Sequence, residues 1–442
     1  MKQKKVGIWG YGSVGKSVHR YALKQDFALH IMDSTYADNK IKDNITYWPE
    51  TTHEAFFKAI DWYVPSPGIN NAKLKNVPYE KMVSEVDLFY KEWNKKIIAI
   101  TGSVGKTTTT HFLHTLIEQC NKKIITGGNI GTPMLDLLDY TDKEIALLEL
   151  SSFQLEHALF FRPHIAAWTN IYPNHLDRHK NEDAYFLAKY NILKQQTPDD
   201  LAILPTSLKP LLDKHGWPSS RIIFFEDRKI DMQTDAEYCF HNNYIYKKNK
   251  NNELISICNI STISSKTHWQ NWLLIISLLS ETNLLHNNFL HHASELKPLA
   301  HRMQTIIDNQ NIHVINDSKS TTSASTIAAM NQCTSKNIIL MLGGISKGVD
   351  RSELIATLNN KVIHVITFGA EACMLQKMCI QNNIPSTACK NLAIAVKAGY
   401  EKSTQYTHST LLFSPSGSSF DLFKDYQERG ETFISLVKTI IQ

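Results

Sequence analysis

Short apolar runs alternate with amphipathic segments along much of the chain, a pattern typical of strands followed by helices. The first run, Val6 to Trp9, precedes a glycine-rich turn, a helix-like segment through Leu23, and a second apolar run that ends at Asp33. Consecutive strands that are separated by helices usually pair in parallel. The pattern therefore predicts a small α/β sheet at this end of the chain.

Two later blocks repeat the alternation. The middle block has apolar runs at residues 96–100, 145–150 and 164–170, followed by short strand-like runs with Asn- and Lys-rich turns between residues 222 and 257. The last block has apolar runs at residues 314–316, 338–342, 362–368 and 411–413. We therefore predict an α/β protein of three domains, with boundaries at residues 1–93, 94–297 and 298–442.

Composition excludes several classes of protein. The 442 residues are 43% hydrophobic and carry a net charge of +5 that is not gathered into blocks, so we expect no nucleic-acid partner. Seven cysteines without a CxxC pair favour reduced thiols over a disulfide framework or a zinc site. No stretch approaches the roughly 20 apolar residues of a membrane span, and glycines interrupt the apolar run after the basic N-terminus. We expect a cytoplasmic monomer with neither a signal peptide nor a transmembrane helix.

The segment Thr101 to Thr108, Thr-Gly-Ser-Val-Gly-Lys-Thr-Thr, follows an apolar run and opens a helix-like segment. Such a glycine loop directs backbone N–H groups at a polyphosphate, a lysine neutralises the outer phosphates, and a threonine hydroxyl can ligate Mg²⁺. It is shorter than the strict P-loop pattern, because Ile100 stands where the first glycine belongs. The loop predicts an ATP site, and the alternative is a glycine turn before a helix.

The first block contains a second glycine motif. Gly10 to Gly15 fits G-x-G-x-x-G, and Asp33 follows about 20 residues later, as in dinucleotide sites. The glycines would admit a diphosphate to the helix N-terminus, and Asp33 could bond a sugar hydroxyl. The alternative is a tight packing turn without a ligand.

Polar residues follow the strands of the middle block. Glu149 ends one strand, where open α/β sheets bind ligands, and a carboxylate there can hold the Mg²⁺ that bridges ATP phosphates. The next strand leads to His175 and His179, and Lys189 lies in the helix that follows. Taken alone, His179 could be a surface histidine and Lys189 a solvated helix lysine.

These motifs fall in the order found in the Mur ligases, and the chain resembles that family over nearly its whole length. The resemblance rests on the phosphate loop together with Gly128-Asn129-Ile130-Gly131-x-Pro133, Glu149 to Leu155, Asn174-His175-Leu176-Asp177-Arg178, His301-Arg302, Asn316-Asp317-Ser318-Lys319 and Leu342-Gly343-Gly344. The Ser-Ser-Phe-Gln-Leu segment and the C-terminal run from Ser414 to Gly430 are most similar to the branch that adds D-glutamate.

The resemblance implies a Rossmann-like UDP-binding domain, a P-loop ATPase-like domain and a Rossmann-like amino-acid-binding domain, in that order. It implies an ATP-dependent ligase that activates UDP-N-acetylmuramoyl-L-alanine as an acyl phosphate and joins it to D-glutamate. ATP and two Mg²⁺ ions would serve this reaction. Catalysis and metal binding would fall to Lys106, Thr107, Glu149, His175 and a carbamate on Lys189.

The remaining implied site residues form two groups. ATP would contact Gly102, Ser103, Gly105, Lys106, Thr107, Thr108, Asn129, Asn271, Arg302 and Asp317. The UDP-sugar and D-glutamate would contact Gly12, Ser13, Asp33, Ser66, Gly68, Ser151, Lys319, Thr321, Lys347, Ser419, Phe420 and Tyr426.

Some positions depart from the family pattern. Val104 replaces a polar loop residue, Thr322 replaces an Asn, and Asn174 replaces an Asp beside the metals, which predicts weaker Mg²⁺ binding. Two other functions stay open: a related amide ligase, such as another Mur enzyme or a folylpolyglutamate synthase, and a non-enzymatic nucleotide switch. A switch would not need Glu149, His175 and Lys189 together.

Overall fold

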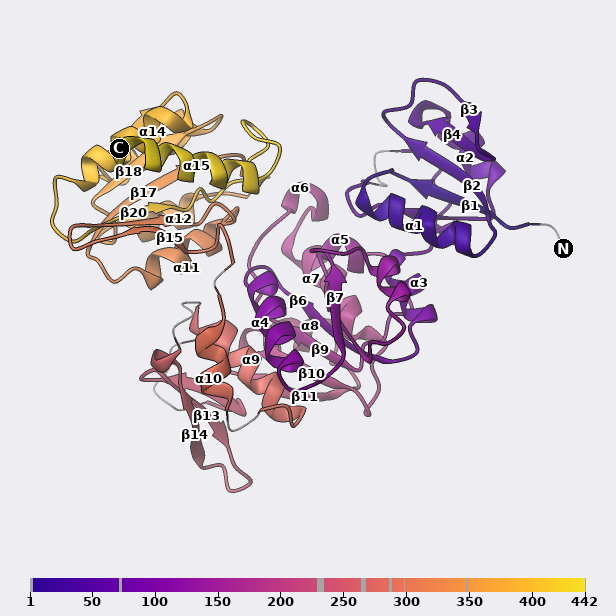
Figure 1. Ribbon diagram of the computed structural model, residues 1–442, viewed down its shortest axis with the longest axis horizontal. Coiled ribbons are helices and arrows are strands. Elements are labelled where there is room, and N and C mark those ends of the chain that lie inside the picture. The colour runs from indigo at the N-terminus through magenta and orange to yellow at the C-terminus, as the bar shows by residue number, and fades with distance from the viewer. Residues whose placement is uncertain are drawn as a thin grey trace. The chain divides into compact units, whose positions relative to one another are not determined.

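The computed structural model describes residues 3–70, 74–228, 234–263, 268–285, 288–297, 299–346 and 349–441. These residues form two compact units, one of residues 1–171, 183–262 and 270–293, and one of residues 172–182, 263–269 and 294–442. The predicted α/β class is confirmed (Figure 1). One sheet falls within each of the three predicted segments, whose boundaries stay a prediction.

The first sheet of the first unit has the order β3-β4-β2-β1-β5 and is parallel except for the β3–β4 pair. Its strands are β1 (Lys5–Trp9), β2 (Ala28–Asp33), β3 (Lys40–Lys42), β4 (Ile45–Pro49) and β5 (Trp62–Pro65). Its helices are α1 (Ser13–Lys24) and α2 (His53–Ala59), and α3 (Glu85–Glu92) leads to the next sheet.

The second sheet has nine strands in the order β14-β13-β12-β11-β10-β9-β6-β8-β7. The strands are β6 (Lys96–Thr101), β7 (Ile124–Gly128), β8 (Ile145–Glu149), β9 (Ile165–Trp168), β10 (Leu201–Pro205), β11 (Arg221–Phe225), β12 (Tyr238–His241), β13 (Tyr244–Lys248) and β14 (Leu254–Asn259). Strands β8, β9 and β10 are buried along their whole length, because helices cover both faces of a parallel sheet. The short strands predicted near residues 222–257 are β11 to β14, of which the last three pair antiparallel.

The helices of this part of the chain are α4 (Lys106–Glu118), α5 (Ser152–Leu155), α7 (Glu182–Lys194), α8 (Lys209–His215), α9 (Trp269–Glu281) and α10 (Phe289–Glu295). One apolar core continues from beneath α1 into the nine-stranded sheet. An ion pair between Arg20 of α1 and Asp136 spans the same junction. The first two sheets are therefore packed together within one unit.

The second unit contains the third sheet, of order β15-β16-β20-β17-β18-β19, parallel except for the β15–β16 pair. Its strands are β15 (Gln304–Asp308), β16 (Ile312–Asn316), β17 (Asn337–Gly343), β18 (His364–Phe368), β19 (Ser386–Cys389) and β20 (Ser409–Phe413). The helices of the second unit are α6 (Leu176–His179), α11 (Ser323–Gln332), α12 (Ser352–Leu358), α13 (Ala372–Gln381), α14 (Leu392–Ser403) and α15 (Tyr426–Ile441). Separate apolar cores lie on the two faces of this sheet.

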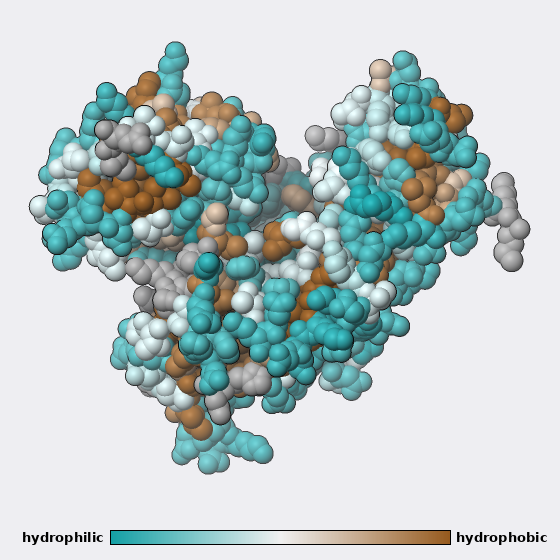
Figure 2. Space-filling model, viewed as in Figure 1, coloured by the Kyte–Doolittle hydropathy of each residue, from teal (hydrophilic) through white to brown (hydrophobic). Residues whose placement is uncertain are grey.

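The visible surface is largely hydrophilic, with hydrophobic side chains gathered in limited areas (Figure 2). Among the described residues, no helix combines the length and the apolar character that crossing a membrane requires.

We expect Trp272→Ala to destabilise the first unit by about 3–5 kcal/mol, the usual cost of truncating a buried Trp. Trp272 of α9 is 1% exposed and stacks on Phe112 of α4 with ring centroids 5.3 Å apart. Urea unfolding followed by circular dichroism measures the change. Trp217→Ala is the control, because Trp217 is 47% exposed. Equal effects of the two substitutions would contradict the assigned packing.

Candidate functional site

The glycine loop between β6 and α4 has a backbone that only glycine can adopt at two positions. Gly102 has φ +136° and Gly105 has φ +85°. A Cβ on Gly102 would lie 1.9 Å from Thr169 Oγ1, and one on Gly105 would lie 2.3 Å from Asn271 Oδ1. The loop is therefore pressed against the end of β9 and against α9, and α4 begins directly after it at Lys106.

Hydrogen bonds to the segment after β9 fix the loop further. Asn170 Oδ1 accepts from the Val104 N–H at 2.9 Å, while Asn170 Nδ2 and Thr169 Oγ1 donate to the Val104 carbonyl at 3.0 and 2.7 Å. The Ser103 N–H donates to the Asn170 carbonyl at 3.1 Å. Val104 makes these contacts through its backbone, so its apolar side chain is compatible with the loop.

Two lysine side chains converge on the loop. Lys106 Nζ donates to the carbonyl oxygens of Gly102 at 2.8 Å and Ser103 at 3.2 Å. Lys189 Nζ, from α7, donates to the same Gly102 oxygen at 2.8 Å. Lys189 is 1% exposed, so the interpretation as a solvated helix lysine is wrong. Burial and then the neighbouring Lys106 charge hold the pKa of Lys189 well below its ordinary value.

Glu149 ends β8 and is 1% exposed. Its Oε1 accepts from Asn129 Nδ2 at 2.7 Å, and the Asn129 N–H donates to the Glu149 carbonyl at 2.7 Å. Its Oε2 is buried and has no hydrogen-bond partner among the described residues. The Glu149 charge also acts on Lys189, whose pKa it raises against the stronger effect of burial. A buried carboxylate with one free oxygen beside a phosphate-type loop is suited to a hard cation.

His175 belongs to the second unit, so its predicted place beside Glu149 and Lys189 stays a prediction. It has φ +55°, and its N–H donates to Asn174 Oδ1 at 3.0 Å. His179 is 4% exposed, which corrects the interpretation as a surface histidine. Among the described residues, no group of three or more His, Cys, Asp or Glu side chains gathers into a metal site.

The glycine motif of the first sheet is closely packed. A Cβ on Gly15 would lie 2.1 Å from the Gly10 carbonyl, whereas one on Gly12 would meet nothing within 4 Å. Asp33 accepts from the Tyr11 N–H at 2.7 Å and from the Thr35 N–H and hydroxyl at 2.9 and 2.8 Å. Although burial opposes them, these hydrogen bonds lower the pKa of Asp33. The carboxylate thus shapes the loop, and its binding of a sugar hydroxyl stays a prediction.

In the second unit Asp317 follows β16 and is 5% exposed. It accepts from the hydroxyls of Ser320 and Ser414 and from the Met303 N–H at 3.2 Å. Burial nevertheless raises the pKa of Asp317 to about 6. Lys319, two residues later, places Nζ 3.7 Å from the centre of the Tyr426 ring, so two of the predicted site residues are in contact.

The predicted acceptor residues show different degrees of burial. Ser419 is 3% exposed, Phe420 is 69% exposed, and Lys347 lies outside the described residues. Arg429, which belongs to the C-terminal run of residues 414–430, is fully buried. Its guanidinium donates to Ser318 Oγ, the Ser318 carbonyl and the Gly417 carbonyl at 3.0, 2.6 and 2.9 Å. It ties the segment after β16 to the segment after β20.

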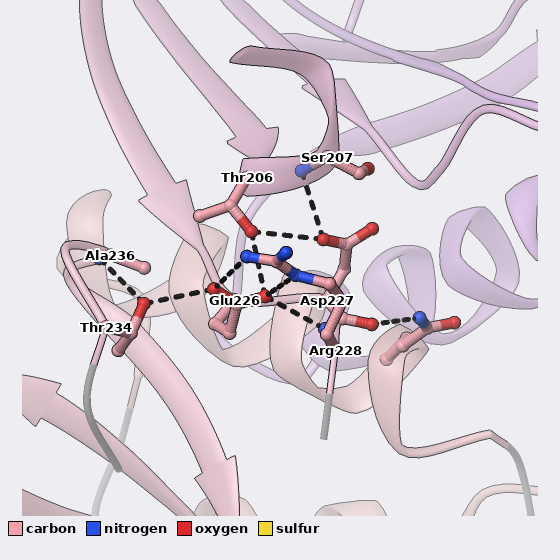
Figure 3. Close-up of polar contacts among 8 residues, drawn as sticks. Thr206, Ser207, Glu226, Asp227, Arg228, Thr234 and Ala236 are labelled. Atoms are coloured by element: carbon pink, nitrogen blue, oxygen red, sulfur yellow. Dashed lines mark hydrogen bonds and ion pairs between the residues drawn. The ribbon is translucent and has the colours of Figure 1, made fainter. Parts of the chain in front are cut away.

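A pocket that the sequence did not indicate lies at the carboxyl ends of β10 and β11. It has a volume of about 870 Å³ and is lined by residues that include Thr206, Ser207, Lys209, Glu226, Arg228 and Thr234. Figure 3 shows Thr206, Arg228 and Thr234 directed at the Glu226 carboxylate, with hydrogen bonds of 2.9 to 3.3 Å. These polar groups are hydrogen-bonded to one another, so the pocket does not indicate a class of ligand.

Comparison with known proteins gives consistent results. The model of the Mur ligase middle domain matches residues 100–270. A UDP-N-acetylmuramoylalanine--D-glutamate ligase of Pseudothermotoga lettingae is 32% identical over 344 residues, which cover 78% of this chain and 76% of the relative. A ligase of the same name from Aquifex aeolicus is 29% identical over 436 residues, which cover 98% of this chain and 98% of the relative.

Solved structures share the fold at low identity. MurF of Acinetobacter baumannii aligns with a TM-score of 0.63 and 13% identity, over 98% of this chain and 93% of its own. MurF ligase of Thermotoga maritima in complex with ADP aligns with a TM-score of 0.58 and 13% identity, over 93% of this chain and 97% of its own.

The raised pKa of Asp317 predicts a pH effect on stability. Its folded-state value of about 6 exceeds the ordinary value of 3.8, so its contribution is fully present below pH 3.8 and is lost as the pH rises through 6. Relative to Asp317→Asn, the wild type should lose about 1–1.5 kcal/mol of unfolding free energy between pH 5 and pH 7.5. Urea unfolding of both proteins at the two pH values measures this difference. A difference that does not change with pH would contradict the assignment.

Proposed function

The chain belongs to the Mur ligase family, and from this premise we propose that it joins D-glutamate to UDP-N-acetylmuramoyl-L-alanine with consumption of ATP, in peptidoglycan precursor synthesis. The observation that carries the proposal is the arrangement around the glycine loop. Lys106 and Lys189 donate to the Gly102 carbonyl, and the buried Glu149 has a hydrogen bond to only one of its two carboxylate oxygens among the described residues. The relatives named for D-glutamate addition favour this substrate pair over the folylpolyglutamate alternative.

In the proposed reaction the terminal phosphoryl group of ATP passes to the alanyl carboxylate of the UDP-sugar. ADP leaves, and the amine of D-glutamate attacks the resulting acyl phosphate. Collapse of the tetrahedral intermediate forms the amide and releases phosphate, and the amine loses a proton. Such a transfer needs positioning and charge neutralisation more than covalent help from the protein. The N–H groups at the start of α4 and the Lys106 ammonium would bind the phosphate oxygens.

Mg²⁺ fits the first unit, because Glu149 Oε2 is a buried carboxylate oxygen to which no group in the described part of the chain donates. We propose that Thr107 and Glu149 hold one ion and that His175 and a carbamate on Lys189 hold a second. When bound, the ions would neutralise the oxygens of the transferred phosphoryl group. Asn129 would hold Glu149 in place through its 2.7 Å hydrogen bond.

The other proposed site residues come from all three predicted domains. We propose that the remaining ATP contacts come from Ser103, Thr108, Asn271, Arg302 and Asp317. We propose UDP-sugar contacts from Gly12, Ser13, Asp33, Ser66, Gly68 and Ser151, and acceptor contacts from Lys319, Thr321, Lys347, Ser419, Phe420 and Tyr426. We further propose that the protein acts as a monomer in the cytoplasm.

Phosphate release tests the function. The wild-type protein should release phosphate from ATP only when the UDP-sugar and D-glutamate are both present. Hydrolysis that needs neither substrate would indicate a nucleotide switch instead. Activity with another amino acid in place of D-glutamate would indicate a different member of the family.

Lys106→Ala and Glu149→Ala should each lower turnover by roughly 10² to 10³, the usual effect of removing one preorganised charge from a closed site. Steady-state phosphate release measures turnover, and circular dichroism checks that the variants are folded. Lys95→Ala is a suitable control, since Lys95 Nζ donates to the carbonyls of Thr141 and Lys143 and lies over the Trp93 ring. Near-normal turnover in both folded variants would contradict the ATP site.

Lys189 should form a carbamate with CO₂. Burial and then the Lys106 charge lower its pKa, which favours the neutral amine, the form that attacks CO₂. After incubation with ¹³C-bicarbonate, ¹³C NMR should show a carbamate signal that Lys189→Met lacks. Activity should also fall on CO₂ depletion and return with bicarbonate. A spectrum identical for both proteins would refute the carbamate.

A further inference from the structure

Arg351 is a buried arginine at the start of α12, and the family resemblance gives it no role. Its side chain is 1% exposed. Burial lowers the pKa of Arg351, while the charges of Glu371 and Asp421 act in the opposite direction. A guanidinium in such surroundings would ordinarily have its donors paired.

The Arg351 guanidinium contacts three segments that follow three adjacent parallel strands. Nη2 donates to the carbonyl of Gly344, after β17, at 3.2 Å, and forms an ion pair of 3.1 Å with Glu371 Oε2, after β18. A Cβ on Gly417, after β20, would lie 2.4 Å from Nη2. The strand order β20-β17-β18 makes these segments neighbours at the ligand-binding edge of the sheet.

Glu371 extends the connection to the segment after β17. Its Oε1 accepts from the Ser346 N–H at 2.9 Å and from the Ser346 hydroxyl at 3.2 Å. The segment after β17 also pairs with the segment after β20, since Ile345 and Ser418 exchange backbone hydrogen bonds of 3.0 and 2.9 Å. Arg351 and Glu371 together therefore fix Gly344 and Ser346 against the chain that leads to Ser419.

The arrangement is not one that stability alone would favour. Among the residues that the structure describes, Arg351 Nε and Nη1 are buried without hydrogen-bond partners, and Glu371 Oε2 has only the ion pair. Unpaired buried donors are destabilising, and apolar residues of similar volume often replace buried ion pairs without loss of stability. A buried arginine kept in this state at a ligand-binding edge indicates a functional constraint.

We infer that Arg351 is a positioning residue of the acceptor site, which acts through Glu371 to hold the segment from Gly344 to Ser346 in register with Ser418 and Ser419. This inference rests on the proposed function, in which Ser419 and its neighbours bind D-glutamate. Arg351 would act on the acceptor through this segment, without contact to ATP or to the UDP-sugar. Its loss should therefore affect one substrate of the three.

The test measures KM for each substrate in full-length Arg351→Met, Arg351→Lys and Glu371→Gln proteins. Arg351→Met should raise KM for D-glutamate roughly tenfold or more, the order of effect seen when residues supporting a site are lost, while the other two KM values change little. Arg351→Lys should raise KM for D-glutamate less than Arg351→Met does, because it keeps a cation beside Glu371. Glu371→Gln should give a KM for D-glutamate between those of the wild type and Arg351→Met, because its amide oxygen can still accept from Ser346.

Arg221→Met is the matched control, since Arg221 pairs with Glu281 in the first unit and is 53% exposed. It should leave all three KM values unchanged. An unchanged KM for D-glutamate in Arg351→Met, or an equal rise for all three substrates, would overturn the inference. If Arg351→Met does not fold, unchanged KM values in the other two variants would overturn it. Failure of the wild type to require D-glutamate would instead overturn the proposed function.

Discussion

One carbonyl oxygen, that of Gly102, accepts hydrogen bonds from two lysine side chains, Lys106 and Lys189, each at 2.8 Å. Lys189 is buried and Lys106 is part-buried. Burial, reinforced by the nearby Lys106 charge, lowers the pKa of Lys189. The loop thus has one lysine suited to phosphate charge and one suited to reaction as a free amine. The proposed metal and ATP chemistry depends on this difference.

Backbone constraints create this convergence. Gly102 and Gly105 pack so tightly against Thr169 and Asn271 that no side chain would fit, which fixes the direction of the Gly102 carbonyl. After β7, Asn129 holds Glu149 of the adjacent β8 by a backbone and a side-chain hydrogen bond. Glu149 Oε2 has no partner within the described ranges. In the second unit, Arg351 and Arg429 link strand-end segments in a comparable way. In both units, groups from the segment that follows one strand fix the position of the segment that follows another strand.

The sequence predicted the features that local patterns encode. Fully buried parallel strands such as β8 appear as continuous apolar runs, and the glycine loop has a fixed spacing before its helix, so the fold class and the place of the glycine loop could be predicted. The burial of Lys189 could not, because a lysine in a helix looks the same in sequence whether it faces solvent or a neighbouring loop. The contacts of Arg351, and those of Thr206 and Thr234 with Glu226, join segments that are separated in the chain, and no local pattern indicates them.

The proposed function requires the loop and Glu149 to form one site for a nucleotide and a divalent cation. Thermal unfolding with ADP, with Mg²⁺, and with both tests this requirement. ADP and Mg²⁺ together should raise the midpoint by more than the sum of their separate effects. Glu149→Gln should keep the response to ADP alone and lose the additional increment. An equal shift by ADP with and without Mg²⁺, or an increment that survives in Glu149→Gln, would contradict the claim.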